Sequence, residues 1–364
     1  LKTICLNYSN RVSLMQNNRT PLIIMARGQG ERLWPLTETQ SKPSLPFADQ
    51  FRMIDFVLSN GVNSKCSPIV VLAQKNESTL ENHCSKYWGN DIVYKPAATE
   101  LLLGNATSVL QFLSELPLDS EHIIIAASDH IYQLDFQTIL QHHIDSNADA
   151  TIVTTIRSSV DSQGFGILKT QRDRVTDFVE KPNLQHPILQ NSTSIISMGI
   201  YVFQRSVLEE VLILDDQNSV SSHDMGRDII PLMLTNQHHI MAVNIPPSKY
   251  WKDVGTLKEY WTAHQDWFSF KRTMSSVRST IQHSQVIDTN FVGQSTICES
   301  AVIDNCIIRN NVSIGSNCHL RYLYISDGCT IESDINLSGS CSNPIFIPAH
   351  TVINEQWIRS LSEQ

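Results

Sequence analysis

The segment "PLIIMARGQGERLWPLTETQSKP" (residues 21–43) joins an apolar run to a loop of glycines and charged residues. The run at 21–26 predicts a buried strand. Gly28 and Gly30 would let backbone N–H groups approach phosphate oxygens closely. Arg32 and Lys42 would add the positive charge that a triphosphate requires. A Gly-x-Gly pair also makes ordinary tight turns, so the loop alone leaves both interpretations open.

Similar apolar runs recur further along the chain, at 68–73, 122–128, 149–156 and 196–203. Continuous runs of this kind are typical of strands buried on both faces of a sheet. Between them lie helical patterns such as 134–145, where Phe136, Ile139, Leu140 and Ile144 are expected to share one face. The alternation predicts an α/β fold with a mostly parallel, Rossmann-like sheet. Its ligands would bind beyond the carboxyl ends of the strands.

After about residue 280 the helical periodicity stops and apolar residues recur every six positions. The series is Val302, Ile308, Ile314 and Leu320, continued after a one-residue shift by Ile325, Ile331 and Leu337, and preceded by Ile297 and Phe291. A hexapeptide repeat gives each coil three flat sides, with one apolar residue per side facing inward. The pattern therefore predicts a parallel β-helix of about three coils.

A chain of 364 residues is long enough for two domains. We expect an N-terminal extension (1–19), a catalytic domain (20–268), a linker (269–280) and the β-helix (281–364). The net charge of −9 disfavours a protein that binds nucleic-acid backbone. The sequence shows no membrane-length apolar run and no signal-peptide pattern, and its eight cysteines form no C-x-x-C pair. A soluble, cytoplasmic protein is therefore expected.

Other charged residues stand where strands are predicted to end. Asp129 follows the run at 122–128 and could hold Mg²⁺ against phosphates, although it could instead cap a helix. Asp253, in "YWKDVGT", is a possible second metal ligand. In "FVEKP", Lys181 could neutralise a monophosphate and Glu180 could accept hydrogen bonds from sugar hydroxyls, while a surface ion pair is the simpler alternative. The histidines show no metal-ligand spacing and are expected to be solvated or core residues.

An ordered set of motifs carries a resemblance to a known family. It comprises "ARGQGERLWPLT…SKPSLPF", "FRMIDFVLSNGVNS", "PIVVLAQKNESTL", "SDHIYQLDF", "GFGILK", "FVEKP", "SMGIYVF", "RDIIP" and "YWKDVGTLKEYW". Together these resemble the glucose-1-phosphate adenylyltransferases, which belong to the sugar-phosphate nucleotidyltransferases. The resemblance covers about residues 20–268. The family also carries a C-terminal left-handed β-helix, which the six-residue period matches.

The resemblance implies attack by glucose 1-phosphate on ATP, which gives ADP-glucose for glycogen or starch synthesis and releases pyrophosphate. The implied roles are ATP phosphates for Arg32 and Lys42, Mg²⁺ for Asp129 and Asp253, the base side for Gln74 and Gly104, the sugar phosphate for Lys181, and glucose for Gly166, Glu180 and Ser197. The implied assembly is a homo-tetramer, or a hetero-oligomer with a paralogous subunit, under allosteric control.

Six positions depart from the family pattern. Arg27 replaces the first loop glycine, Glu31 replaces a serine or threonine, Thr107 replaces an aspartate, and Ser128 replaces a glycine. Thr39 and Gln40 stand where bacterial members often carry basic residues tied to sugar-phosphate activators, so that form of activation is not expected here. The loop substitutions predict an activity that could be reduced. Two alternatives follow: a catalytically weak regulatory subunit or paralogue, and a nucleotidyltransferase for another base or sugar. A hexapeptide-type acyltransferase fits least, since no acyl-donor site is recognisable.

Overall fold

The computed structural model describes residues 20–28, 30–48, 51–97, 104–271, 280–281, 285–287, 289–291 and 294–361. The predicted extension at 1–19 lies outside these residues. The chain divides into two compact units. The first contains residues up to 28 and residues 54–251, and the second contains residues 29–53 and the chain from 252 onward. The second unit therefore takes two segments of the predicted catalytic domain, residues 29–53 near its start and residues 252–268 at its end.

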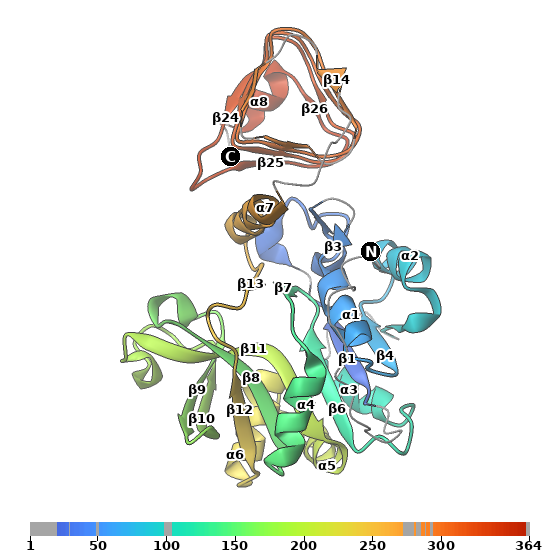
Figure 1. Cartoon of the computed structure of the whole chain (residues 1–364), viewed down its shortest axis with the longest axis vertical. Coiled ribbons are helices and arrows are strands. Elements are labelled where there is room, and N and C mark those ends of the chain that lie inside the picture. Colours follow the sequence, from blue (N-terminus) through green and yellow to red (C-terminus); the bar gives the residue numbers. More distant parts are fainter. Residues whose placement is uncertain are drawn as a thin grey trace. The chain divides into compact units, whose positions relative to one another are not determined.

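The first unit is built on one large sheet (Figure 1). Its described strands lie in the order β5 (Val93–Pro96), β4 (Ile69–Ala73), β1 (Leu22–Ala26), β6 (His122–Ala127), β11 (Thr193–Gln204), β8 (Ala150–Ser158), β12 (Ile240–Asn244), β10 (Arg174–Glu180) and β9 (Gly166–Gln171). All five apolar runs expected to form strands do so. They lie next to one another in the centre of the sheet.

The prediction of a mostly parallel sheet is wrong, because half of the pairs of neighbouring strands are antiparallel. Strands β5, β4, β1 and β6 are mutually parallel, and so are β8 and β12. Strand β11 runs antiparallel to both β6 and β8, and β9 and β10 form an antiparallel pair. A buried apolar run looks the same in either direction, so periodicity does not reveal strand polarity. The sheet is mixed.

Helices cover both faces of this sheet. Helices α1 (Ile54–Asn63), α2 (Ser78–Tyr87) and α4 (Phe136–Asp145) contribute to one apolar core, and α3 (Asn105–Leu113), α5 (Arg205–Asp216) and α6 (Ile230–Thr235) contribute to the other. Neighbouring β1 residues divide between the two cores, Ile24 in the first and Ile23 in the second. This alternation is the pattern of a sheet buried on both sides.

Helix α4 corrects one expected core position. Phe136, Ile139 and Leu140 are buried as predicted, but Ile144 is exposed and His143 is buried. At 100° per residue, position 143 lies within about 20° of Phe136 around the helix, whereas position 144 lies about 80° away. His143 therefore takes the core position, and its Nδ1 lies 2.8 Å from the Thr151 hydroxyl.

The second unit combines a short N-terminal segment, helix α7 (Leu257–Lys271) and a series of parallel strands. The segment holds the 3-10 helices η2 (Glu31–Leu33) and η3 (Lys42–Ser44) and the paired strands β2 (Pro46–Phe47) and β3 (Phe51–Arg52). Helix α7 extends three residues into the predicted linker at 269–280, and residues 272–279 lie outside the described part of the chain.

The C-terminal strands form three parallel sheets around a three-sided outline (Figure 1). One sheet contains β14 (Thr280–Ile281), β17 (Ser295–Ile297), β20 (Val312–Ile314), β23 (Thr330–Ile331) and β26 (Val352–Ile353). The second contains β15 (Gln285–Ile287), β18 (Val302–Asp304), β21 (His319–Arg321) and β24 (Asn336–Ser338), and the third β16 (Asn290–Phe291), β19 (Ile307–Ile308), β22 (Leu323–Ile325) and β25 (Ile345–Ile347). Helix α8 (Glu355–Leu361) follows. This arrangement agrees with the predicted parallel β-helix. The prediction of about three coils was too low, because each side has four or five strands among the described residues.

The interior positions of these strands follow a period of 17 residues. Strand β17 pairs with β20, and β20 with β23, so that Ile297, Ile314 and Ile331 stack. On the next side Ile303 pairs with Leu320 and is buried, while the predicted Val302 is only half-buried. The spacing between interior residues is therefore six, except that it is five once in each coil. One of these five-residue steps lies between 303 and 308, where the six-residue repeat predicted none. Phe291, also predicted, has no described side chain.

Two further features bear on the environment of the protein. Among the described residues no helix combines the length and apolar character needed to cross a bilayer. The described cysteines are free, and those at 66, 84, 306, 318 and 329 are buried, as expected for small core residues. Cys298 is half-buried and Cys341 is exposed.

Candidate functional site

The predicted site residues of the first unit begin at the carboxyl ends of three neighbouring parallel strands. Gly28 follows β1, Gln74 follows β4 and Asp129 follows β6. Strand β1 pairs in parallel with both β4 and β6, so the three strand ends lie on one edge of the sheet. Ligands of open α/β sheets bind at such an edge.

The segment after β1 is tied to its neighbours on both sides. Gln74 Nε2 donates a 2.6 Å hydrogen bond to the carbonyl oxygen of Arg27. The Arg27 guanidinium donates to the hydroxyl of Ser108 on α3. Arg27 is not among the described residues with a positive φ, so an arginine backbone is unstrained where the family pattern has glycine. Partial burial lowers the pKa of Arg27.

Gly104 stands at the N-cap of α3, and its surroundings require glycine. A Cβ added there would lie 2.1 Å from the carbonyl oxygen of His223. Asn105, the next residue, accepts a 2.8 Å hydrogen bond from Met225 N and donates a 3.0 Å one to Asp224. The start of α3 is therefore packed against the backbone of 223–225.

Asp129 lies just beyond β6, and its side chain is about one quarter exposed, at 28%. The alternative that it caps the following helix is wrong. The N-cap of α4 is Asp135, which accepts a 2.9 Å hydrogen bond from Gln137 N. His130 Nε2 lies 3.5 Å from Asp129 Oδ1. Ser128, at a glycine position of the family, donates to Met25 O at 2.8 Å and so ties β6 to β1.

A second group of predicted residues meets at the β9–β10 hairpin. Gly166 pairs directly with Glu180 across the two strands. A Cβ added to Gly166 would lie 2.8 Å from Glu180 Oε2 and 2.3 Å from Phe178 Cζ. Lys181 has a φ of 47° and an exposed side chain, with Nζ 3.3 Å from Glu180 Oε1. The structure thus brings Gly166, Glu180 and Lys181 together.

Burial raises the pKa of the Glu180 carboxyl, and the nearby Lys181 charge opposes that rise. Two neighbours that the sequence reading missed help to form this environment. Asp224 raises the same pKa, and a Cβ added to Gly226 would lie 2.7 Å from Glu180 Oε2. Both belong to the turn that starts the π-helix η7 (Met225–Ile229), in which the backbone N–H groups of Gly226 and Arg227 donate to the Asp224 carboxylate. The one feature of the sequence that could have indicated this neighbour is Gly226 in "HDMGRDIIP" (223–231), since a glycine allows close approach by another side chain.

Ser197 lies in β11 and is buried. Its hydroxyl accepts a 3.2 Å hydrogen bond from Gly199 N and donates to the Tyr201 hydroxyl at 3.3 Å. Gly199 has a φ of 65°, and the pairing of β11 with β8 is irregular between Ser197 and Tyr201. A bulge of this kind re-aims side chains at the edge of a site.

The remaining predicted residues cluster in the second unit. Lys42 is buried, with Nζ 3.6 Å from Asp253 Oδ1. Gly30 has a φ of 72°, and a Cβ added there would lie 2.8 Å from Lys42 Cβ, so glycine is needed for both reasons. Arg32 Nη2 and Asp253 Oδ2 lie 3.2 and 3.3 Å from a Cβ built on Gly255. Glu31, in contrast, is exposed.

Hydrogen bonds with buried polar groups of the same unit fix the chain just after Lys42, at residues 46–48. Ala48 N donates to His264 Nε2 at 3.1 Å, and Arg309 Nη1 donates to Ala48 O at 3.1 Å. The Tyr260 hydroxyl donates to Pro46 O. Burial lowers the pKa of His264 to about 3, so its ring is neutral and accepts the Ala48 N–H. Helix α7 and the C-terminal strands therefore fix residues 46–48.

The predicted site residues of the first unit and those of the second unit share one chemical character. Glycines provide close backbone approach, lysines and arginine provide positive charge, and carboxylates provide hard oxygen ligands. Groups of this kind position and neutralise phosphates without forming a covalent intermediate. The sequence profile of the nucleotidyl transferase family matches residues 22–269. The chain therefore belongs to the nucleotidyl transferase family.

Within that family its similarity is to proteins named glucose-1-phosphate adenylyltransferase. The Kocuria rhizophila protein is 35% identical over 268 aligned positions, with 67% of this chain and 65% of that relative covered. The Nitrosococcus oceani protein is 30% identical over 380 aligned positions, with 89% of this chain and 90% of the relative covered. The Bacillus subtilis protein is 33% identical, with coverage of 80% and 79%.

Proposed function

We propose that this chain transfers AMP from ATP to glucose 1-phosphate and releases pyrophosphate, making ADP-glucose for glycogen or starch synthesis. The observation that carries the proposal is the buried Lys42, paired with Asp253 and packed against the left-handed Gly30 turn. A fixed cation beside a glycine turn suits a triphosphate. The relatives named glucose-1-phosphate adenylyltransferase supply the sugar and the base.

The reaction is an in-line displacement. A phosphate oxygen of glucose 1-phosphate forms a bond to the α-phosphorus of ATP, and the bond to the bridging oxygen of pyrophosphate breaks. We assign Arg32 and Lys42 to the ATP phosphates, with the backbone at Gly28 and Gly30. We assign Gln74 and Gly104 to the base. Lys181 would hold the sugar phosphate, with Glu180, Gly166 and Ser197 around the glucose ring.

Mg²⁺ is the proposed cofactor, with Asp129 and Asp253 as its ligands. Both residues offer carboxylate oxygens, which are the ligands this ion prefers, and neither side chain is fully buried. When bound, the ion would neutralise phosphate charge. The chain's own contribution is to hold Asp253 beside Lys42, whose Nζ lies 3.6 Å from Asp253 Oδ1 and so orients that carboxylate.

The finer architecture is also part of the proposal. We propose that the three C-terminal sheets form a left-handed β-helix of hexapeptide repeats, behind a catalytic domain at 20–268, a linker at 269–280 and an extension at 1–19. We propose a cytoplasmic homo-tetramer or hetero-oligomer under allosteric control. The acidic net charge gives no support to a nucleic-acid partner.

Pyrophosphate release from ATP, glucose 1-phosphate and Mg²⁺ tests the proposal. We expect turnover by the wild-type chain and its near-complete loss in Asp129→Ala, with Asp129→Asn as the variant that keeps the shape. Asp161→Ala, an exposed aspartate elsewhere in the first unit, serves as the matched control. Folded protein that turns over no nucleoside triphosphate with any sugar phosphate would overturn the enzymatic function.

A regulatory subunit with weak catalysis is the second candidate, and the loop substitutions Arg27 and Glu31 favour it. Arg27→Gly and Glu31→Thr restore the family pattern. A large gain in kcat/KM in either variant would show that the loop is impaired. Co-purification with a paralogous subunit from the same organism tests the assembly, and failure to associate would remove this candidate.

A further inference from the structure

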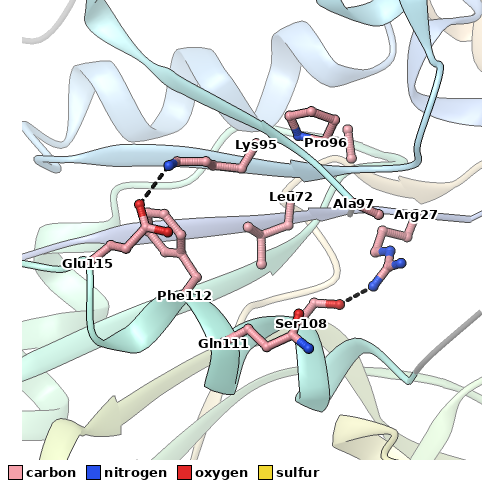
Figure 2. A pocket seen from close by; sticks show the side chains of 10 residues that line it. Arg27, Leu72, Lys95, Pro96, Ala97, Ser108, Gln111, Phe112 and Glu115 are labelled. Carbon is pink, nitrogen blue, oxygen red and sulfur yellow. Dashed lines mark hydrogen bonds and ion pairs between the residues drawn. The ribbon is translucent and has the colours of Figure 1, made fainter. Parts of the chain in front are cut away.

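A cavity of about 200 Å³ opens beside Arg27 in the first unit (Figure 2). Its walls come from the end of β4, the end of β5 and one side of α3. Strands β1, β4 and β5 are parallel, so the cavity lies at the carboxyl edge of the sheet. None of the residues assigned above to ATP, Mg²⁺ or glucose lines it.

The charges around the cavity do not cancel. At one end Lys95 Nζ lies 2.6 Å from Glu115 Oε2, so these two charges neutralise each other. At the other end the Arg27 guanidinium points to the Ser108 hydroxyl, which is neutral. Among the described residues no carboxylate forms an ion pair with Arg27. The lining therefore carries a net charge of +1, located on a partly desolvated guanidinium.

Between these two ends the walls are apolar. Leu72 and Phe112 face the space in Figure 2, and Phe112 lies against the Lys95 ammonium, 5.5 Å from ring centroid to nitrogen. An apolar or aromatic body would bury itself against these side chains. A charged group at one end of that body would reach Arg27.

We propose that this cavity binds a small organic carboxylate, with its carboxylate on Arg27 and its apolar body against Leu72 and Phe112. A carboxylate fits better than a phosphate monoester because it carries one negative charge at neutral pH, which matches the net +1 of the lining. The planar guanidinium can donate two parallel hydrogen bonds to a carboxylate, which a lone hydroxyl does not accept.

Occupation of the cavity acts on the neighbouring phosphate loop, an effect that rests on the proposed function. Arg27 directly precedes Gly28, and its carbonyl oxygen is held by Gln74. The positive charge of Arg27 attracts a nucleoside triphosphate, and a bound carboxylate neutralises that charge. A carboxylate ligand therefore raises KM for ATP.

Benzoate is the probe, and benzamide is its neutral counterpart of nearly the same shape. Calorimetric titration of the full chain should show benzoate binding that is weakened about tenfold or more in Arg27→Gln. The loss should be smaller in Arg27→Lys, which keeps the positive charge but not the two parallel hydrogen bonds. Arg172→Gln, which changes an exposed turn arginine, should leave the affinity unchanged. Thermal unfolding of each variant confirms that it is folded. Equal benzoate affinity in the wild type and Arg27→Gln, or equal binding of benzamide, overturns the site.

The kinetic arm tests the link to the loop. Benzoate should raise KM for ATP in the wild type and leave KM unchanged in Arg27→Gln. Benzoate binding without any change in KM of an active enzyme overturns the link to the loop. The titration needs no turnover, so an inactive chain that still binds benzoate through Arg27 contradicts the proposed function and leaves the cavity assignment standing.

Discussion

Lys42 and Lys181, the two lysines proposed to hold phosphate groups, lie in contrasting surroundings. Lys42 is buried and paired with Asp253 in the second unit, on a segment fixed by α7 and the C-terminal strands. Lys181 is 56% exposed at the end of a hairpin in the first unit, beside the less exposed Glu180. The first lysine is held in place before any ligand arrives, whereas the second is free to change rotamer. We infer that Lys42 acts on the chemical step and Lys181 on capture of the sugar phosphate.

The largest effect is expected for Lys42→Met. Loss of this cation removes charge stabilisation at the transferred phosphates, so kcat should fall on the order of 100-fold or more. Steady-state pyrophosphate release measures it. The control is Lys258→Met, an exposed lysine on α7. A variant that changes only KM for ATP would contradict the role in the chemical step.

Lys181→Met should act mainly on KM. One charge-assisted contact to the sugar phosphate is lost, so KM for glucose 1-phosphate should rise about tenfold with little change in kcat. Lys169→Met, which removes another exposed lysine from the same hairpin, is the matched control. If kcat falls as far as in Lys42→Met, the contrast between the two lysines is lost.

Gly226→Ala sharpens the description of the Glu180 environment. The added methyl group would lie 2.7 Å from Glu180 Oε2 and displace that carboxylate, so KM for glucose 1-phosphate should rise about threefold. Gly164→Ala is the control, because its added Cβ meets nothing within 4 Å. An unchanged KM in Gly226→Ala would mean that the position of Glu180 does not matter for sugar binding.

The smallest effect is a dependence of stability on pH through Glu180. Its folded-state pKa is raised, mainly by burial, so the folded chain binds this proton more tightly than the unfolded chain. The stability that Glu180 contributes is therefore present at pH values below 4.5, the ordinary pKa of a glutamate, and is lost as the pH rises through the pKa of Glu180 in the folded chain. Glu180→Gln should raise Tm by a few degrees or less at neutral pH and by less below pH 4.5. A lower Tm at neutral pH would contradict the sign.

Much of the fold followed from apolar patterns, because burial on both faces of a strand leaves an unbroken run. All five predicted strands were found, and the six-residue repeat identified the C-terminal sheets. Polarity and register were harder to predict. Strand β11 is antiparallel, which an apolar run does not reveal because it looks the same in either direction. Ile303 rather than Val302 faces the interior, because a run of neighbouring apolar residues does not show which one faces the core.

The site residues were predicted one by one, but their partners depend on long-range packing. Nothing near Arg27 in the sequence indicates Ser108, which lies 81 positions further along. Likewise Glu180 meets Gly226 only because the 223–226 turn packs against the β10 end. Local motifs therefore identify which side chains are present, while the environment that sets their charge and position comes from the tertiary fold.

The support of residues 46–48 by His264 and Arg309 has a consequence for how the chain can be divided. A cut at residue 268 looks natural in the sequence, since the family profile ends at 269. Such a fragment would keep Lys42 but lose Arg309, one of the groups that hold its segment. Shuffling of the C-terminal domain between proteins would then replace part of the ATP-side scaffold, so the two parts are expected to be inherited together.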